Sequence, residues 1–205
     1  MRKVAFFGWS RKIAYCVGLI TSDGSLSISG RHVDFSSKDL ELIEKISLIL
    51  GVKNKCSIKK SGSGSYCYRV QISNVYFYRF LLSVGLIPNK SKQLSGLTIP
   101  HDYFFHFLRG CIDGDGNINV YFSKNSRLPQ LKIKLSSGSY EFLKWVMTQI
   151  QALTLIKDGW IQHEKSVYTL VYGKKSGIIL LKEIYKKSYP WYLTRKKDIA
   201  NQFLL

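Results

Sequence analysis

The chain has 205 residues, 45 % of them hydrophobic, so it can form one large domain or two small ones and is not compositionally disordered. No apolar run reaches the roughly 18 residues of a membrane span, and the four cysteines lack the paired spacing of a zinc site. The 31 basic and 13 acidic residues give a net charge of +18, which favours nucleic acid as the partner over the plainer alternative of a basic protein from a Lys-rich proteome.

The N-terminal residues MRKVAFFGW resemble the start of a signal peptide. However, Arg11 and Lys12 interrupt the apolar run, and no small-residue cleavage site follows it. We therefore expect no signal peptide. The unpaired cysteines agree with a reducing compartment, so we expect an intracellular protein without a membrane partner.

The first half of the chain predicts a helix that ends in an Asp-Gly pair, followed by two strand pairs and two further helices. The first helix covers Arg11–Ser22 and runs into Asp23 and Gly24. Strands are predicted over Ser25–Ser29, Arg31–Ser36, Lys53–Lys60 and Tyr66–Ser73, and helices over Asp39–Leu50, with an N-cap region at Ser37, and over Val75–Val84. The turn sequence SGSGS joins the strands of the second pair.

The second half predicts the same order of elements. Its first helix covers His101–Gly114 and precedes Asp115 and Gly116. Strands are predicted over Asn117–Ser123, Gln130–Ser136, Ile156–His163 and Ser166–Tyr172, and helices over Tyr140–Leu153, with an N-cap region at Ser137, over Lys175–Lys187 and over Lys196–Leu204. The turn-rich sequence KNSRLP joins the first two strands.

The two halves are copies of one another. The stretch VGLITSDGSL (Val17–Leu26) matches RGCIDGDGNI (Arg109–Ile118), with the Asp-Gly pairs 115 − 23 = 92 residues apart. Paired serines follow at the same place in each half, Ser36-Ser37 and Ser136-Ser137. We predict a duplicated domain, with repeats over residues 1–97 and 98–205, rather than a solenoid. The order αββαββα, present twice, predicts an α+β fold with antiparallel sheets and helices on one face.

Alternation along the predicted strands gives each sheet an apolar face, expected to pack on helices, and a polar face. The polar faces carry Lys, Arg, Gln, Asn, Ser and Tyr with almost no Asp or Glu, whereas an ordinary solvated face mixes acids with bases. We therefore predict that they contact DNA. The predicted contacts are Ser25, Ser27, Ser29, Arg31, Lys55, Lys59, Arg69, Gln71, Asn117, Asn119, Tyr121, Gln130, Lys132, Lys134 and Thr169.

The repeated Asp-Gly pair predicts a metal site. Gly24 and Gly116 are expected to end their helices in the left-handed region. Asp23 and Asp115 then lie at helix C-termini, where the helix dipole disfavours an anion. Small residues, Ala14 and Gly18 on one helix and Gly110 on the other, allow the two helices to pair about a pseudo-twofold axis. Paired carboxylates there would suit a divalent cation such as Mg²⁺, although a single Asp-Gly would be an ordinary turn.

VGLITSDG and RGCIDGDG resemble the two motifs of the LAGLIDADG homing endonucleases in their single-chain form. The segments GLIPNKS and YLTRKK, with the paired serines, extend the resemblance over essentially the whole chain. The resemblance implies a monomer whose two sheets form a DNA-binding saddle, with the motif helices between the repeats. It implies cleavage of both strands of a long pseudo-palindromic or asymmetric DNA site with Mg²⁺ or Mn²⁺, and binding without cleavage in Ca²⁺.

The resemblance also assigns roles to residues. Asp23 and Asp115 would hold the metal, Lys90 and Lys196 would stabilise charge, and Ser36 and Ser136 would lie near the attacking water. The repeats differ from the family pattern in two places: Thr21 stands where the second repeat has Asp113, and Arg109 replaces a small residue.

Two other readings of the sequence stay open. One is a DNA-binding protein that does not cleave, and the other is a maturase with intron RNA as a further partner. Both acids are retained, which favours the enzyme. An intein is disfavoured because flanking splicing segments do not fit. As an endonuclease linked to intron mobility, the protein would act with DNA in a bacterial or archaeal cytoplasm or in an organelle.

Overall fold

A computed structural model describes residues 7–60, 64–122, 128–186 and 190–204. Several predicted features lie wholly or partly outside these ranges: the end of the strand at Ser123, the end of the helix at Lys187, and most of the SGSGS and KNSRLP turns.

The described residues of the first repeat form three helices, four strands and a short 3₁₀ turn. In chain order they are α1 (Arg11–Asp23), β1 (Gly24–Leu26), β2 (Val33–Ser37), α2 (Leu40–Leu50), β3 (Ser57–Lys60), β4 (Tyr66–Ile72), α3 (Val75–Val84) and η1 (Lys90–Lys92). The second repeat follows as α4 (His101–Asp115), β5 (Gly116–Tyr121), β6 (Gln130–Ser137), α5 (Tyr140–Leu153), β7 (Trp160–Glu164), β8 (Val167–Tyr172), α6 (Lys174–Tyr185) and α7 (Thr194–Asn201). The predicted α+β order αββαββα, present twice, is confirmed.

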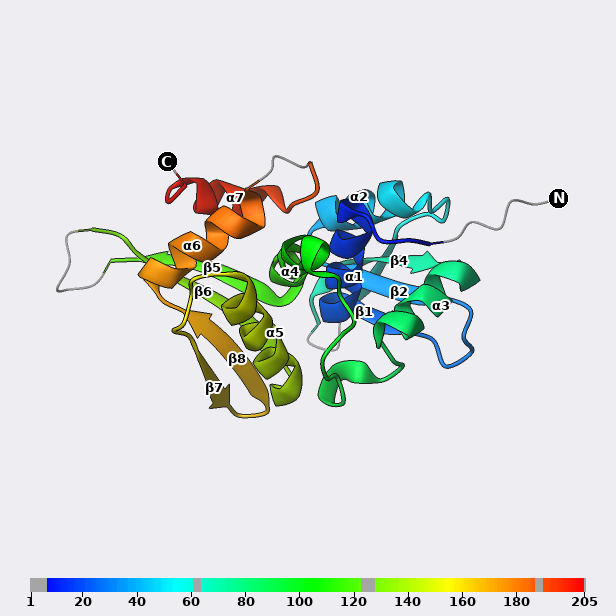
Figure 1. The fold of residues 1–205 in the computed structure, drawn as a ribbon. Helices are drawn as coiled ribbons and strands as arrows, with labels where there is room; N and C mark the ends of the chain where they lie inside the picture. The colour runs from blue at the N-terminus through cyan, green and yellow to red at the C-terminus, as the bar shows by residue number, and fades with distance from the viewer. Residues whose placement is uncertain (1–6, 61–63, 123–127, 187–189, 205) are drawn as a thin grey trace.

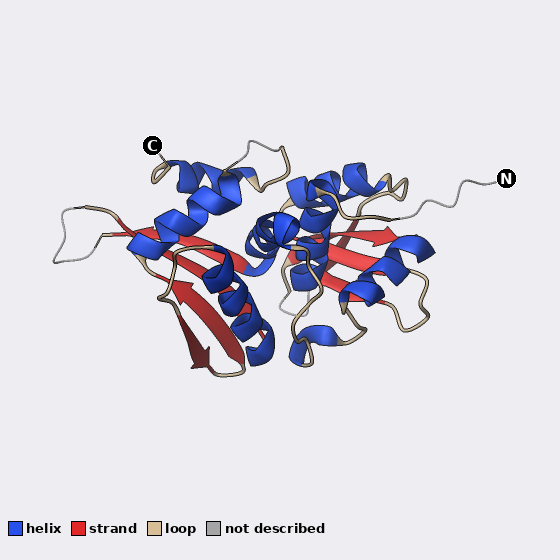
Figure 2. Ribbon diagram, in the orientation of Figure 1, coloured by secondary structure: helices blue, strands red, loops and turns tan. Residues whose placement is uncertain are grey.

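Each repeat forms one antiparallel four-stranded sheet, and the two sheets have the same topology. The strand orders are β1-β2-β4-β3 and β5-β6-β8-β7. The register repeats as well: Gly24 pairs with Phe35 as Gly116 pairs with Leu135. Figures 1 and 2 show α1 and α4 side by side at the centre, with one sheet on either side of them.

Period-two burial places the helices on one face of each sheet. In β6 the apolar residues Leu131, Ile133 and Leu135 are buried, whereas the residues between them remain partly exposed. In Figure 1, α5 and α6 cover the near face of the second sheet and α3 covers that of the first. Burial of these apolar side chains against helices is the main stabilising term of such layers. The opposite, polar face of each sheet is left without a helical cover.

Three strands, β1, β3 and β7, are shorter than predicted by at least two residues. The first ends at Leu26, because Ser27 accepts the amide of Gly30 in a turn where Gly30 adopts φ 72°. Ile28 is consequently 84 % exposed rather than packed in the core. β3 begins only at Ser57 and β7 only at Trp160.

The predicted N-cap regions are displaced by two residues. α2 is capped at Asp39 and α5 at Ser139, whose hydroxyl accepts the amide of Phe142. Ser37 and Ser137 instead accept the amides of Asp39 and Ser139, so they shape the approach to each helix. Within the described ranges, no helix is long and apolar enough to cross a bilayer.

Candidate active site between the repeats

The motif helices α1 and α4 touch backbone to backbone, as their small residues predict. A Cβ on Gly18 would lie 2.1 Å from the carbonyl oxygen of Phe107, and a Cβ on Gly110 would lie 2.2 Å from that of Tyr15. Each glycine therefore faces the other helix, and their Cα atoms come within van der Waals reach. The pairing confirms the predicted interface and brings the C-terminal ends of both helices together.

Both helices end at a glycine, but not in the conformation that the sequence suggested. Gly24 has φ −93° and Gly116 has φ −86°, so both are extended and the left-handed prediction is wrong. The glycines are needed for space instead: a Cβ would lie 2.7 Å from Ile20 at the first position and 2.5 Å from Ile112 at the second. The chain thus folds back directly over the last helical turn and enters the sheet without a loop.

Asp23 and Asp115 end the two helices beside one another. The position of a Cβ on Gly114 is 2.9 Å from Oδ2 of Asp23, so the first carboxylate lies against the end of α4. Burial, and then the charge of Asp115, raise the pKa of Asp23 to about 7, although Lys196 and then Lys90 oppose the shift. Loss of solvent also raises the pKa of Asp115, which Lys90 and then Lys196 lower. The two acids therefore repel each other at a site that disfavours two negative charges.

The two lysines assigned by resemblance lie near the acids, one from each repeat. Lys90, in η1, is buried and donates to the carbonyl oxygen of Gly24 at 2.6 Å. Lys196, in α7, is buried and donates to that of Gly116 at 2.7 Å. The two contacts are equivalent under the repeat, because each ammonium binds the glycine that follows its repeat's acid.

Lys196 makes three further contacts in the last turn of α4. It donates to the carbonyl oxygens of Ile112, Asp113 and Gly114 at 2.5, 2.9 and 3.3 Å. A cation at a helix C-terminus satisfies orphan carbonyls and offsets the negative end of the dipole. Burial lowers the pKa of Lys196 to about 8, although Asp113 opposes this shift.

Ser36 and Ser136 lie one ladder step beyond Gly24–Phe35 and Gly116–Leu135, on the side of the acids. Both are half-buried. Ser136 Oγ lies 3.2 Å from Thr169 Oγ1 on the neighbouring strand, and Ser36 pairs in register with Arg69. The register therefore places each serine one residue beyond the pair made by the glycine that follows the acid.

Sequence reasoning missed a buried network behind the acids. Asp113 Oδ2 accepts the hydroxyl of Tyr15 and the amide of Leu193, both at 2.8 Å, so it ties α1 and the segment before α7 to α4. Arg109, noted only as a departure, is 1 % exposed; it donates to the carbonyl oxygen of Ile184 and contacts His106 Nδ1. Its side chain turns toward α6, which leaves the glycine contact between the motif helices undisturbed. The only signal in the sequence was that these two residues differ between the repeats.

The polar face of the first sheet carries an acid that the sequence analysis overlooked. Asp34 lies in register between Ser25 and Gln71, and its Oδ1 accepts Arg69 Nε and Nη2 at 3.2 and 2.8 Å. Asp34 is therefore an exception to the prediction that these faces carry almost no acids. Part of the charge of Arg69 is already neutralised there.

The other predicted contacts divide between the sheets and the loops. The shortened β1 leaves Ser27, Ser29 and Arg31 in the β1–β2 loop, and the late start of β3 leaves Lys55 in the segment before it. On the second sheet, polar residues pair across three strands: Asn117 with Lys134, Asn119 with Lys132, Tyr121 with Gln130, and Ser136 with Thr169. Lys132 also lies 5.1 Å from the ring centre of Tyr121. No acid lies in these four pairs.

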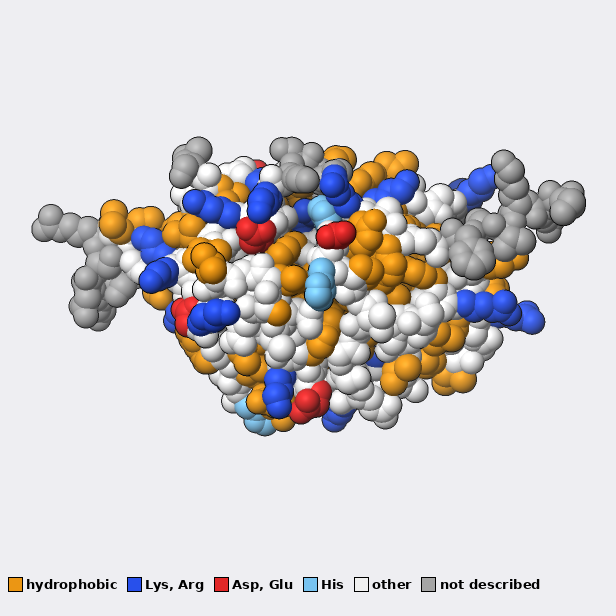
Figure 3. Space-filling model, viewed as in Figure 1, with side chains coloured by type: hydrophobic (Ala, Val, Ile, Leu, Met, Phe, Trp, Pro, Cys, Tyr) orange, Lys and Arg blue, Asp and Glu red, His pale blue; other side chains and the backbone are white. Residues whose placement is uncertain are grey.

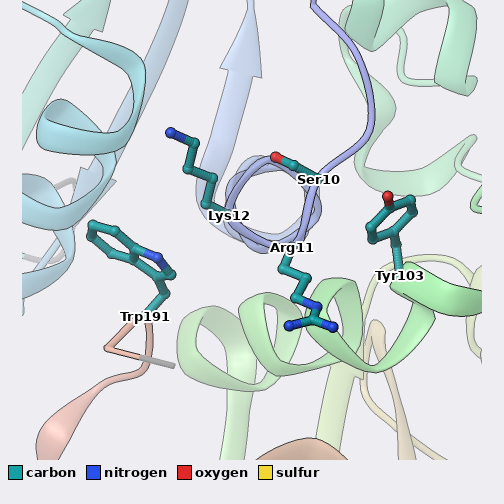
Figure 4. A pocket seen from close by; sticks show the side chains of 5 residues that line it. All are labelled: Ser10, Arg11, Lys12, Tyr103 and Trp191. Carbon is teal, nitrogen blue, oxygen red and sulfur yellow. The ribbon is translucent and has the colours of Figure 1, made fainter. Parts of the chain in front are cut away.

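The face of the molecule seen in Figure 3 carries basic side chains of the described residues at separate places. In Figure 3, the Lys and Arg side chains on this face are scattered among hydrophobic and acidic ones. A cavity of about 340 Å³ lies there, at the N-terminal end of α1, lined by Ser10, Arg11, Lys12, Tyr103 and Trp191. Figure 4 looks along α1 into this cavity, with Arg11 directed toward α4 and Trp191 near Lys12. It is at the opposite end of α1 from Asp23, so it does not belong to the acid site.

The acid pair has the chemistry of an open metal site rather than of a closed one. Among the described residues, no group of three or more His, Cys, Asp or Glu side chains is arranged to hold a metal ion. Mg²⁺ typically binds to one or two carboxylates and completes its shell with water and substrate phosphate oxygens. Two carboxylates held together, each penalised for its charge, fit such an ion and leave its remaining positions to a phosphate.

The fold and this site define a class: two α+β repeats that pair through motif helices and place one acid each at the joint. Residues 11–85 match the sequence model of the family described as the LAGLIDADG-like domain. The match covers α1 to α3, so this part of the chain is similar to that family. A search of curated protein sequences finds no match.

Solved structures extend the likeness to both repeats. The homing endonuclease I-WcaI bound to its DNA recognition sequence is 14 % identical with a TM-score of 0.65, covering 95 % of this chain and 88 % of that one. I-DmoI in complex with DNA and Mn is 17 % identical with a TM-score of 0.59, covering 87 % and 98 %. The N-terminal LAGLIDADG domain of DUF199/WhiA is 16 % identical with a TM-score of 0.62, covering 96 % and 90 %. The chain therefore has the single-chain, two-repeat LAGLIDADG fold.

Proposed function

We propose that the protein is a site-specific endonuclease that cuts both strands of a long pseudo-palindromic or asymmetric DNA site with Mg²⁺ or Mn²⁺. The observation that carries this proposal is the acid pair: Asp23 and Asp115 meet at the end of the motif helices, flanked by two buried lysines. The solved I-WcaI and I-DmoI structures, described with their DNA, support DNA as the partner. Residues 1–97 and 98–205 would be the two repeats, acting together as one monomer.

In this proposal the polar sheet faces hold the duplex and the acid pair lies over its scissile phosphates. A divalent ion on Asp23 and Asp115 would lower the pKa of a bound water and offset charge on the phosphate. The buried Lys90 and Lys196 add fixed positive charge next to the acids, where little solvent screens it. Ser36 and Ser136 accept or donate a hydrogen bond to water. Ca²⁺ would support binding without cleavage.

The test is selection from a randomised duplex library in Mg²⁺, followed by cleavage of the recovered duplex with each strand labelled. We expect cuts in both strands with Mg²⁺ or Mn²⁺, and binding alone with Ca²⁺. Matched variants are Asp23→Asn and Asp115→Asn, with Asp102→Asn in the exposed first turn of α4 as control. Tight binding without cleavage in every divalent ion would refute the endonuclease.

A second candidate function is DNA binding without cleavage. It is favoured by the likeness to the WhiA domain, because the fold is not confined to proteins described as endonucleases. In that case the selected duplex would bind with steep salt dependence and stay intact, and Asp23→Asn would leave the affinity unchanged. An intron RNA competing for the same polar faces would mark the maturase alternative.

A further inference from the structure

Each lysine of the site is held by a segment that crosses to the opposite repeat. Residues 192–196, here called the crossing segment, belong to the second repeat but lie on α2 of the first. Arg195 donates from Nε and Nη2 to the two carboxylate oxygens of Asp39, both at 2.8 Å. Glu41 accepts the amide of Thr194 at 3.2 Å and its hydroxyl at 2.5 Å. The residue that follows Thr194 and Arg195 is Lys196, whose ammonium lies at the acid site.

The first repeat shows the reciprocal arrangement. Lys90 is followed by Ser91, whose carbonyl oxygen would lie 2.7 Å from a Cβ on Gly138, so the chain presses on the start of α5 in the second repeat. Ser139 Oγ donates to the carbonyl oxygen of Leu94 in the same segment. By the alignment of the repeats, Ser139 corresponds to Asp39. The N-terminus of the second helix in each repeat therefore receives the lysine-bearing segment of the other.

The electrostatics of the acids agree with this exchange. Apart from burial and Asp115, the strongest influence on the pKa of Asp23 is Lys196, from the other repeat. Apart from burial, the strongest influence on Asp115 is Lys90, again from the other repeat. Each lysine therefore donates hydrogen bonds within its own repeat, while its charge acts more strongly on the acid of the other repeat.

We infer that Asp39 and Arg195 are positioning residues: their ion pair fixes the crossing segment on the first repeat and thereby aims Lys196 at the acid site. This inference deepens the proposed endonuclease function and rests on it for the consequence in cleavage. The placement of Lys196 itself does not depend on that function. Each half of the acid site therefore combines both repeats. The acid belongs to one repeat, and the lysine belongs to the other repeat but is positioned by a contact with the repeat that carries the acid.

The ion pair is suited to positioning rather than to stability. The Arg195 side chain is 57 % exposed and that of Asp39 24 %. Pairs this exposed contribute little to the free energy of unfolding, yet a bidentate fork fixes geometry. A small displacement of a catalytic group lowers rates far more than it lowers stability. Substitutions in the Asp39–Arg195 pair should therefore change the position of Lys196 with little change in the free energy of unfolding.

The first experiment needs only the protein. Lysine amines are acetylated in the native state and the labelled positions are read by mass spectrometry. Because Lys196 is 3 % exposed, it should label slowly in the unchanged protein. In Asp39→Asn and in Arg195→Gln we expect its labelling to rise about fivefold, as local opening of the segment becomes easier. Lys90 in the same sample is the internal control and should stay protected.

The matched control variant is Glu183→Gln. It removes the Lys186–Glu183 pair, whose side chains are 66 % and 27 % exposed, and which lies on α6 away from the acids. This variant should leave the labelling of Lys196 unchanged. The reversed pair, Asp39→Arg with Arg195→Asp, should restore the protection of Lys196, which a merely structural loss would not do.

The second experiment measures strand-specific cleavage of the library-selected duplex under single-turnover conditions. Asp39→Asn should slow one strand about tenfold and the other little, so nicked DNA accumulates, with affinity in Ca²⁺ unchanged. Unchanged labelling of Lys196 in both single variants, or no rescue by the reversed pair, would overturn the inference. If the unchanged protein cuts no DNA, the endonuclease proposal fails, and the labelling experiment still decides the positioning.

Discussion

The two repeats share one plan but complete it differently. In the first, Lys90 donates to one carbonyl oxygen of the described residues, that of Gly24, and the third residue after the motif glycine Gly18 is Thr21, whose hydroxyl donates to Val17 in its own helix. In the second, Lys196 contacts four carbonyl oxygens, and Asp113 reaches across to another helix. The features that the repeats share, the close glycines and the paired acids, are those that the proposed chemistry needs. The features that differ fix the surrounding segments.

The largest expected effect comes from the shared acids. Asp23→Asn or Asp115→Asn should each lower the single-turnover cleavage rate about 10³-fold, because either change halves the anionic charge available to a cation. Binding to the selected duplex in Ca²⁺-free buffer should persist. If one variant cuts at the original rate while the other does not, the two acids are not equivalent, which would contradict a shared role in both repeats.

The shared glycine contact should dominate stability. Gly18→Ala places a Cβ 2.1 Å from a backbone oxygen of α4, which cannot move without separating the helices. We expect a loss of about 3 kcal/mol in the free energy of unfolding, measured by denaturant titration. Gly110→Ala should cost a similar amount. Gly8→Ala, where a Cβ meets nothing within 4 Å, is the control and should be neutral.

The two lysines should differ in stability. Lys196→Met leaves four carbonyl oxygens without their partner, whereas Lys90→Met leaves one. The expected losses are about 3 and about 1 kcal/mol. Equal losses in thermal or denaturant unfolding would show that the extra contacts of Lys196 carry no weight.

Asp113 should give the second repeat a pH dependence that Thr21 cannot give the first. Burial raises the pKa of Asp113 to about 6, while the hydrogen bonds from Tyr15 and Leu193 oppose the shift. Between its unfolded pKa, near 4, and 6, the folded state binds the proton more tightly, so this contribution to stability falls as pH rises. The advantage of the wild type over Asp113→Asn should shrink by about 2 kcal/mol from pH 4.5 to 7. An advantage that stays constant or grows over this range would contradict the assignment.

The smallest effect should come from the sheet faces. Asp34→Asn frees Arg69 and should raise DNA affinity about twofold, with a slightly steeper salt dependence. The converse change in the second sheet, Asn119→Asp, sets an acid opposite Lys132 and should lower affinity by a similar factor. Filter binding at several salt concentrations measures both. Changes in affinity of opposite sign would support the difference between the two sheet faces. Changes of the same sign would contradict it.

Much of the fold could be predicted because each repeat confirms the other. Period-two and helical patterns fix the order of elements, and the duplicated Asp-Gly marks the ends of α1 and α4. The predicted strand boundaries were wrong where the geometry of a loop determines the end of the strand. Gly30 in the left-handed region ends β1 early, although Ile28 continues the alternation. A pattern of apolar residues does not report where a chain turns.

The acids and the glycine interface were also accessible from the sequence, and the structure brings together the lysines that the resemblance assigned. The contacts between Asp39 and Arg195, or Asp113 and Leu193, were not accessible, because they join residues 156 and 80 positions apart. Nothing in local composition marks such pairs. Asp34 was visible in the sequence as an acid, but only the structure shows that it accepts hydrogen bonds from Arg69 on the neighbouring strand.

The crossing segment has a consequence for the order of events during synthesis. A ribosome releases the first repeat before the second, and that repeat can begin to fold as it emerges. Its acid Asp23 is then present, yet the segment that brings Lys196 to it has not been made. A half-made chain can therefore hold the first sheet and Asp23 without the lysine that the second repeat contributes. The ion pair between Arg195 and Asp39 can form only after both repeats have been translated and have packed together.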